Sequence, residues 1–234
     1  MKKIAFFVEG QTEQLFIEKL LSEVFDYKKI AIEVKKIRGG KKVPISITAI
    51  VSPTVSSETS YYVLIYDCGG DSNIRSYIQD QRESLINSGY KKIIGIRDVY
   101  PDFKREEIHR LLYGLNFKLP QKDLSIKFIL SVMEIESWFL AEQNHYLKIN
   151  TTLTPEFILT NAKFNPSTFD TELIDEPALK LNEVYMLAGE KYKKENAIIS
   201  RTINSIDYAN LYFEVHKRIS SLNELIEEIN KEID

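Results

Sequence analysis

Cysteine and histidine are scarce in this chain of 234 residues, and their scarcity excludes two kinds of site. Cys68 is the single cysteine, so no disulfide can form within the chain, which fits a reducing cytosol. The three histidines, His109, His145 and His216, are far apart in the sequence and show no zinc-binding spacing. Any bound metal would therefore be held by carboxylates, which favours Mg²⁺ or Mn²⁺.

Long hydrophobic stretches are also missing. No window reaches the roughly 18 apolar residues that a membrane-spanning helix needs. The apolar stretch near the N-terminus, Ile4 to Val8, runs straight into Glu9 and is too short for a signal peptide. We therefore expect a cytoplasmic protein that does not contact a membrane. Hydrophobic residues make up 44% of the chain, which predicts an ordinary globular core.

The overall charge is only −3, which gives no general case for nucleic-acid binding. The distribution of charge is uneven, however, because the segment from 28 to 42 carries seven basic residues against one acid, Glu33. Such a run forms either a solvated surface or a non-specific contact for a phosphate backbone. The seven basic residues are Lys28, Lys29, Lys35, Lys36, Arg38, Lys41 and Lys42.

Strand-like apolar stretches alternate with segments of helical periodicity up to about Ala141. This alternation predicts an α/β fold with a doubly wound, mainly parallel sheet and right-handed crossovers. Strands are expected at 4–8, 30–37, 61–66, 92–97 and 124–132, and helices at 12–25, 43–51, 73–86, 104–115 and from Ser137.

The alternation stops after the first α/β domain, which we place at residues 1–143. Residues 144–234 are expected to form a second, loop-rich and helical region that packs on the first domain or extends it. Its last part carries a heptad stripe, which predicts a long helix. The helix would pack the stripe on its own domain, or present it to a second copy or a partner protein. The stripe consists of Tyr208, Tyr212, Val215, Ile219, Leu222, Ile226, Ile229 and Ile233.

Four acids, Glu9, Asp67, Asp98 and Glu134, each follow directly on a predicted strand. In a parallel sheet these positions share the edge where ligands bind in open α/β folds. Carboxylates gathered there repel one another, so a cluster of them needs a cation. The pattern predicts a Mg²⁺ or Mn²⁺ site at this edge.

Local roles that need no metal are also open to the acids of this region. Asp71 is placed to cap the helix that follows it, and Asp98 to cap a turn. Glu134 and Glu136 lie in the first turn of a helix, where acids favour the helix dipole, and we expect only one of them to point at the site. Glu13 either reaches the same edge as Glu9 or lies in solvent.

Two motifs resemble known sequences. The first is Val-Glu-Gly-Gln-Thr-Glu at 8–13, and the second is Met-Glu-Ile-Glu-Ser-Trp-Phe-Leu-Ala at 133–141. A glutamate after the first strand and an aspartate after a later one resemble the TOPRIM fold of topoisomerases, primases and OLD-family nucleases. The two motifs together resemble a bacterial TOPRIM-like family whose members tend to be encoded beside an AAA/ABC-type ATPase, in the manner of anti-phage defence pairs. The resemblance covers residues 3–143.

The resemblance implies a Mg²⁺-dependent nuclease that acts on DNA or RNA. Glu9 would be a metal ligand and general base, and Asp67 the principal metal ligand. The second aspartate of the TOPRIM Asp-x-Asp pair is replaced by Gly69, so Asp71 or Asp98 would complete the ligand set. Glu134 or Glu136 would serve a second metal, and the phosphate backbone would be held by Arg38, Lys41 and Lys42.

A non-catalytic function is the alternative: a TOPRIM-like binding or regulatory subunit that docks a partner. The departure at Gly69 and the acidic net charge favour it, whereas the four strand-terminal carboxylates favour the nuclease. A phosphatase or nucleotide-binding protein is disfavoured, because no glycine-rich phosphate loop follows the first strand. Cys68 is expected to be a poor nucleophile, since its acidic neighbour raises the thiol pKa.

Overall fold

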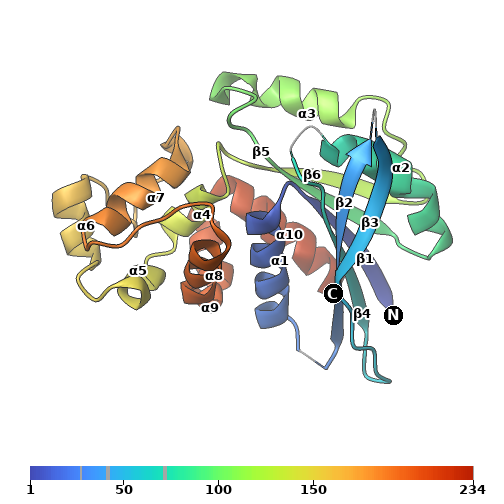
Figure 1. Ribbon diagram of the computed structural model, residues 1–234, viewed down its shortest axis with the longest axis horizontal. Helices are drawn as coiled ribbons and strands as arrows, with labels where there is room; N and C mark the ends of the chain where they lie inside the picture. The colour runs from blue at the N-terminus through green and yellow to red at the C-terminus, as the bar shows by residue number, and fades with distance from the viewer. Residues whose placement is uncertain (27, 41–42, 71–72, 234) are drawn as a thin grey trace. The chain divides into compact units, whose positions relative to one another are not determined.

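The computed structural model describes residues 1–26, 28–40, 43–70 and 73–233. Its centre is a six-stranded sheet in the order β3-β2-β4-β1-β5-β6 (Figure 1). The predicted α/β class is therefore confirmed. The strands are β1 Lys2–Val8, β2 Ile30–Gly40, β3 Val43–Val51, β4 Tyr61–Asp67, β5 Lys92–Asp98 and β6 Ser125–Ser131.

The sheet is mainly parallel, as the sequence predicts. Strand β1 pairs in parallel with both β4 and β5, and β2 pairs in parallel with β4. Strand β6 runs along β5 in the same direction, since Ser125 N donates to Lys91 O at 2.9 Å and Val99 N donates to Ser131 O at 3.3 Å. Strand β3 differs, because it pairs antiparallel with β2 in a hairpin.

Helices connect the parallel strands. Helix α1, Gln11–Val24, leads from β1 to β2 in one direction, whereas α2, Ile74–Asn87, leads from β4 to β5 in the other. Right-handed crossovers therefore put α1 on one face of the sheet and α2 on the opposite face, an arrangement that can be followed in Figure 1. The connection from β5 to β6 contains η2, Arg105–Glu107, and α3, Ile108–Asn116.

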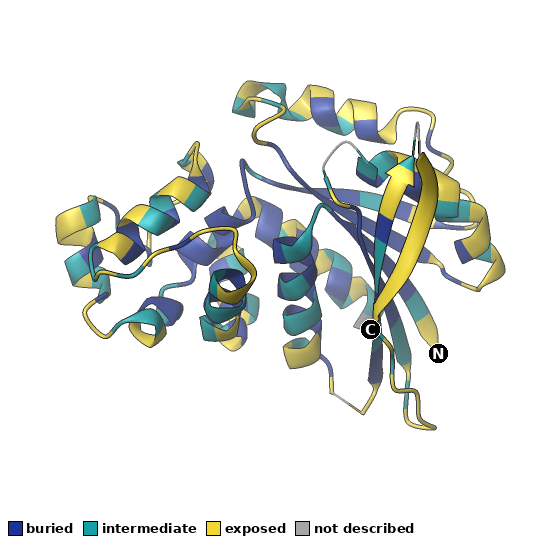
Figure 2. Cartoon of the chain, in the orientation of Figure 1, coloured by how far each residue is buried: buried dark blue, intermediate teal, exposed yellow. Residues whose placement is uncertain are grey.

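The middle of the sheet forms the core of this part of the chain. Every residue of β5 is buried, and Ala5, Phe7 and Val8 of β1 are fully buried (Figure 2). Strands buried on both faces read as continuous apolar runs. That is why β1, β4 and β5 can be predicted from the sequence.

The helix predicted at 43–51 is wrong, because this segment is strand β3. Its β-branched residues suit a pleated surface, and the turn before it depends on glycine. Gly39 and Gly40 have φ of 103° and 126°, and a Cβ on Gly39 would lie 2.3 Å from the carbonyl oxygen of Pro44. The strand is exposed along almost its whole length (Figure 2).

The chain divides into two compact units. The first is Met1–Arg97 with Glu107–Leu130, and the second is Asp98–Glu106 with Ser131–Asp234. Residue 143, where we placed the domain boundary, falls inside the second unit. The helices of the second unit are α4 Glu136–Ala141, α5 Asn144–Ile149, α6 Pro155–Ala162, η3 Thr171–Leu173, α7 Pro177–Met186, α8 Asn196–Ser205, α9 Tyr208–Phe213, η4 Val215–Arg218 and α10 Ser220–Ile233.

The heptad stripe does not lie on one long helix, so that part of the prediction is wrong. The short helices α9 and η4 and the 14-residue helix α10 carry most of it, and Ile219 lies between η4 and α10. Asp207 caps α9 by accepting a hydrogen bond from Asn210 N. The stripe side chains are nevertheless covered by the chain itself. Those that are buried are Tyr208, Val215, Ile219, Leu222, Ile226 and Ile229.

None of the helices in the described ranges combines the length and the apolar character that a membrane crossing requires.

Candidate functional site

Glu9 and Asp67 come from neighbouring strands of the first unit. Val8, the last residue of β1, pairs in register with Asp67, the last residue of β4. The two strands stay linked beyond that point, since Cys68 N donates to Val8 O at 2.9 Å and Gly70 N donates to Glu9 O at 2.8 Å. Asp67 is 1% exposed and Glu9 is half-buried. The backbone thus places both acids at one edge of the sheet, as expected from parallel pairing.

The Asp67 carboxylate is engaged by Arg38 of β2. Arg38 Nη2 donates to both Asp67 carboxylate oxygens at 3.1 Å, and Nη1 donates to the Asp67 carbonyl oxygen at 3.0 Å. Gly69 N adds a hydrogen bond to Oδ1 at 3.0 Å, and Lys36 Nζ lies 3.7 Å from Oδ2. Hydrogen bonds between an arginine and a carboxylate are charge-assisted and stronger than neutral ones. Asp67 therefore orients the guanidinium of Arg38.

The glycine at position 69 is part of the same arrangement. Gly69 has φ of 69°, and a Cβ there would lie 2.7 Å from the guanidinium carbon of Arg38. Any side chain at this position would collide with Arg38 unless the arginine moved away. Position 69, where the TOPRIM pattern has its second aspartate, is therefore a glycine that leaves room for the guanidinium of Arg38.

These residues do not fit a metal site as they stand. Within the described ranges, no three histidine, cysteine, aspartate or glutamate side chains gather so that they could hold a metal ion. Both oxygens of Asp67 accept hydrogen bonds from Arg38, and Mg²⁺ would have to displace that cation. The predicted ligand Asp71 and the predicted phosphate contacts Lys41 and Lys42 lie outside the described residues.

Glu13 and Cys68 have local roles in the first unit. Glu13 is buried, and its Oε2 accepts a hydrogen bond from Gly10 N at 2.9 Å, which caps the start of α1. Cys68 is also buried, and burial, together with the charge of Asp67, raises the pKa of its thiol. The expectation that Cys68 is a poor nucleophile is consistent with this pKa.

Asp98, the last residue of β5, belongs to the second unit. Its Oδ1 accepts a hydrogen bond from Ile135 N at 3.0 Å and another from the Ser131 hydroxyl. Asp98 is 1% exposed, so its carboxylate fixes the turn between β6 and α4. This is a local capping role of the kind that the sequence left open, although the turn it caps follows β6 and not β5.

Glu134 and Glu136 share one lysine. Glu134 Oε1 lies 3.2 Å from Lys194 Nζ, and Glu136 Oε1 lies 3.6 Å from the same atom. Tyr192 OH donates to Glu136 Oε1 at 2.6 Å, while Ala178 N, in the first turn of α7, donates to Glu134 Oε2 at 2.9 Å. Both acids therefore point to the Lys194 ammonium group.

Glu136 is the more deeply buried of these two acids. It is fully buried, and its Oε2 has no hydrogen-bond partner among the described atoms. Burial raises its pKa, and the charge of Glu134 raises the pKa further, against an opposing effect of Lys194. Burial and the neighbouring Glu134 therefore favour the protonated form of Glu136, whereas Lys194 favours the charged form.

A pocket of about 690 Å³ opens in the second unit beside the loops that follow β5 and β6. Its lining includes Tyr100, Phe103, Met133, Lys104 and Glu176. The carboxyl ends of strands are the usual place for ligands in open α/β sheets. None of the predicted site residues within the described ranges lines this pocket.

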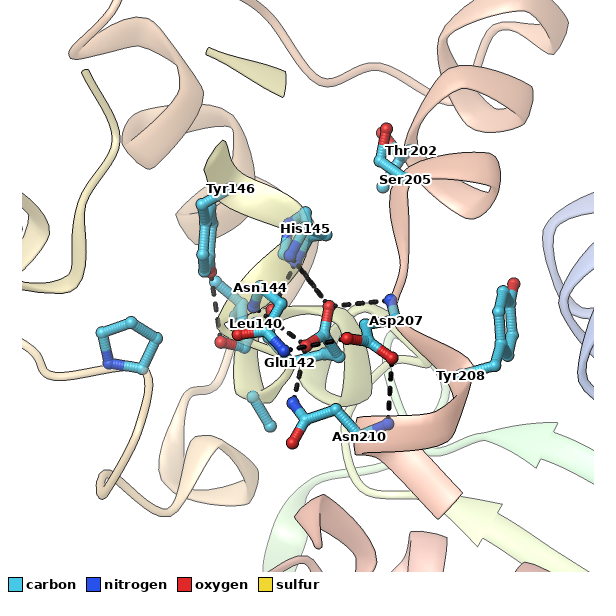
Figure 3. A network of polar contacts seen from close by, with 12 residues as sticks. Leu140, Glu142, Asn144, His145, Tyr146, Thr202, Ser205, Asp207, Tyr208 and Asn210 are labelled. Atoms are coloured by element: carbon cyan, nitrogen blue, oxygen red, sulfur yellow. Dashed lines mark hydrogen bonds and ion pairs between the residues drawn. The ribbon is translucent and has the colours of Figure 1, made fainter. Parts of the chain in front are cut away.

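A further polar network surrounds Glu142 (Figure 3). Its Oε1 accepts hydrogen bonds from Asn144 N and Asn210 Nδ2, and its Oε2 accepts from His145 N and Asp207 N, at 2.7–3.1 Å. Burial alone would raise the pKa of Glu142, but these hydrogen bonds and His145 outweigh it and lower the pKa. The carboxylate is satisfied on all sides, so it ties the start of α5 to α9 and leaves no acceptor for a ligand.

Sequence reasoning missed the two partners of Glu136. Tyr192 and Lys194 lie more than fifty residues beyond it in a loop between α7 and α8, and no spacing connects them. Arg38 was singled out as a phosphate contact, but its pairing with Asp67 was not foreseen. Gly69 was the sequence feature that could have indicated this pairing, because a residue without a side chain beside an aspartate leaves room for another group.

Comparison with known proteins adds little. No protein-family model and no protein of curated function matches this chain. A solved structure described as "the putative cell surface hydrolase from Lactobacillus plantarum WCFS1" is similar to it with a TM-score of 0.36 and 10% identity, over 100% of this chain and 91% of that chain. A likeness at that level carries no argument about function.

Proposed function

We propose that this chain is a non-catalytic, TOPRIM-like module that binds the phosphate backbone of a nucleic acid through Lys36 and Arg38. The observation that carries the proposal is the ion pair in which Arg38 Nη2 contacts both carboxylate oxygens of Asp67, with Gly69 leaving space for the guanidinium. The acid that the TOPRIM pattern assigns to a metal here orients a cation.

The two cations are placed to meet a ligand. The side chain of Arg38 is 46% exposed and that of Lys36 is 41% exposed, although the carboxylate beneath them is almost fully buried. Both side chains project from β2 on the face that carries Asp67, because Lys36 pairs with Asp67 in register. Arginine and lysine held in this way supply charge-assisted hydrogen bonds to phosphate without selecting a base sequence.

The Mg²⁺-dependent TOPRIM-type nuclease is the second candidate. One observation favours it: Val8 pairs with Asp67, which brings Glu9 and Asp67 to adjacent positions at the sheet edge. In this case Arg38 has to leave Asp67 before a metal can bind, and the donor set then depends on Asp71, which lies outside the described residues. The proposed cytoplasmic location, the AAA/ABC-type ATPase partner and the anti-phage role have the sequence resemblance as their only support.

Fluorescence anisotropy with labelled duplex DNA, single-stranded DNA and RNA tests the first candidate. In EDTA, we expect binding that weakens with added salt and that Lys36→Gln weakens for every sequence, with a smaller salt slope. Lys19→Gln is the matched control, because Lys19 is similarly exposed on α1 and pairs, within the described ranges, with Glu23. An absence of binding at low salt, or equal losses in both variants, would contradict the proposal.

A cleavage assay with the same nucleic acids separates the two candidates. Wild type, Glu9→Gln and Asp67→Asn are incubated with Mg²⁺ or Mn²⁺. The module predicts intact substrate in every lane. Cleavage by the wild type that both substitutions abolish would overturn the module and establish the nuclease.

A further inference from the structure

Strand β3 is an edge strand with an unusual composition. It is the first strand in the sheet order, and in the described ranges no strand pairs with its outer side. Its nine residues, Val-Pro-Ile-Ser-Ile-Thr-Ala-Ile-Val, include no charged residue. Large apolar side chains stand in solvent along it: Val43 is 63% exposed, Ile45 42%, Ile47 41% and Ile50 53%.

Natural sheets protect exposed edges with charged residues, proline or bulges. Proline and one bulge occur at the turn end of the strand, and a second shift in register lies at its other end, between Val34 and Lys35 of β2. The pairing between β2 and β3 shifts register between Arg38 and Gly40, and Pro44 falls within that shift. Between the two shifts, Ser46 to Ala49 pair regularly with β2, and among the described residues nothing pairs with their outer backbone groups. This stretch carries no charge to repel a neighbour.

We propose that a second copy of this chain pairs antiparallel with β3 about a two-fold axis at Ile47, which joins the two sheets. The lack of charge selects the second copy as the occupant. Two-fold pairing sets a strand against itself, and any charged residue near the axis would meet its own like charge. A partner chosen by charge, in contrast, finds nothing to recognise between Val43 and Val51.

The residues that would face one another suit this arrangement. With Ile47 on the axis, each Ile47 meets its own copy, Ser46 meets Thr48, and Ile45 meets Ala49. β-branched side chains opposite each other and Ser–Thr pairs are favourable across antiparallel strands. Residues of the same parity meet in this register, so the outward-facing backbone groups of one strand meet those of the other.

The same pairing would bring Lys36 and Arg38 of both copies to one face of the joined sheet. Within the hairpin, Arg38 pairs with Ser46 and Lys36 pairs with Thr48, so these four side chains share one face. In the dimer, a row of side chains would run across the sheet from Arg38 and Ser46 of one copy to Thr48 and Lys36 of the other. The two-fold axis would generate a second, equivalent row. The two β2 strands would lie about 14 Å apart, three strand spacings.

The dimer thus has a two-fold face with four cations and four hydroxyl groups. A duplex nucleic acid has backbone two-fold axes of its own, so this face matches a duplex better than a single strand. The use of the face for a duplex rests on the proposed function, whereas the dimer itself does not.

Sedimentation equilibrium of the full chain tests the dimer without nucleic acid. We expect a reversible dimer. Ile47→Glu should raise its dissociation constant at least about tenfold, because two carboxylates then face each other on the axis. Ile47→Thr keeps a β-branched residue and should remain dimeric. A wild type that stays monomeric at the highest attainable concentration, or a dimer that Ile47→Glu leaves intact, overturns the proposal.

Cross-linking decides the matter even if Ile47→Glu fails to fold. Ile47→Cys places two thiols on the axis, where mild oxidation should give a disulfide-linked dimer. Ile50→Cys is the matched control: Ile50 is similarly exposed, but two-fold pairing sets it opposite Pro44, far from its own copy. The native Cys68 is 1% exposed and should not react. Equal cross-linking at both positions, or none at position 47, contradicts the two-fold register.

A dimer that forms but shows no preference for duplex DNA would leave the interface standing and remove the proposed use of its face. Conversely, Lys36-dependent nucleic-acid binding by a monomer would keep the proposed function and overturn the dimer. The two proposals therefore fail separately.

Discussion

Arg38 and Asp67 form a pair whose two members differ sharply in exposure: the carboxylate is 2% exposed, whereas the guanidinium side chain is 46% exposed. The buried member depends on the exposed one for its neutralising charge, while the exposed member can still reach water. This asymmetry predicts that the two residues differ in their tolerance of substitution.

Arg38→Gln should destabilise the protein more than Asp67→Asn. Among the described residues, loss of the arginine leaves the buried carboxylate with Lys36 and Gly69 N beside it. We expect a cost of about 1–2 kcal/mol in the free energy of unfolding. Loss of the carboxylate leaves a cation that water can solvate, and the cost should be smaller. Urea unfolding of the two variants measures the difference.

The double variant is the control for this pair. If the cost of Arg38→Gln comes from an unpaired carboxylate, adding Asp67→Asn should recover part of the lost stability. Strictly additive effects would show that the two side chains do not depend on each other.

The hairpin before β3 gives a prediction about two adjacent glycines. Gly39→Ala should destabilise the protein by about 1–3 kcal/mol, because it combines a positive φ with a collision against the carbonyl of Pro44. Gly40→Ala also carries a positive φ, but its Cβ would meet no described atom within 4 Å, so it should cost less. Thermal unfolding of both variants tests this order, and equal midpoints would refute it.

Glu142 predicts a loss of stability in acid. The pKa of Glu142 is lowered in the folded state. Its contribution to the free energy of unfolding is therefore present when the pH is above the ordinary pKa of 4.5, and it disappears as the pH falls through the folded-state pKa. Glu142→Gln should cost about 2–3 kcal/mol at neutral pH, since a donor then faces backbone N–H groups. The cost should shrink as pH falls from 6 to about 3.

Glu183→Gln is the matched control for Glu142. Glu183 is 54% exposed, and its partner in the part of the chain that the structure describes is Lys180, one helical turn away. Its replacement should change the free energy of unfolding by less than about 0.5 kcal/mol at either pH. A cost for Glu142→Gln that does not vary with pH would argue against the charged network.

Glu136 predicts the opposite dependence. The pKa of Glu136 is raised in the folded state. Its contribution to the free energy of unfolding is therefore greatest when the pH is below the ordinary pKa of 4.5, and it is lost as the pH rises through the folded-state pKa. Relative to the wild type, Glu136→Gln should therefore gain stability as pH rises from 4 to 7. Lys194→Met removes the cation that opposes the shift, so the wild-type residue at 136 should then become more costly at neutral pH. Parallel pH profiles for wild type and Glu136→Gln would contradict the raised pKa.

The buried strands could be predicted from the sequence because burial on both faces leaves a direct mark on it. β1, β4 and β5 are continuous apolar runs that end at an acid or just before one, and parallel pairing then places those ends at one edge. Strand β3 left a weaker mark. Val43, Ile47, Ile50 and Val51 fit helical spacing, while Ile45, Ile47, Ala49 and Val51 alternate, so the choice between helix and strand depended on its β-branched residues.

The candidate site was predictable only in part, since side-chain partners are set by tertiary contacts. The position of Asp67 follows from local sequence, but its pairing with Arg38 arises from β2 lying beside β4. The cluster around Glu136 needs a loop from a distant part of the chain. The heptad stripe identified a buried surface correctly but could not show where the helix is interrupted.

The division into units has a consequence for synthesis on the ribosome. The chain passes between the units after Arg97, after Glu106 and after Leu130. Residues 98–106 therefore emerge before the residues that Asp98 binds, Ser131 and Ile135, and at roughly 5–20 residues per second they wait for a few seconds. All residues of the first unit have emerged once Leu130 has been added, before Asp98 can meet its partners. A stop codon after Leu130 therefore yields the whole first unit together with residues 98–106, whereas no single stop codon or protease cut yields the whole second unit.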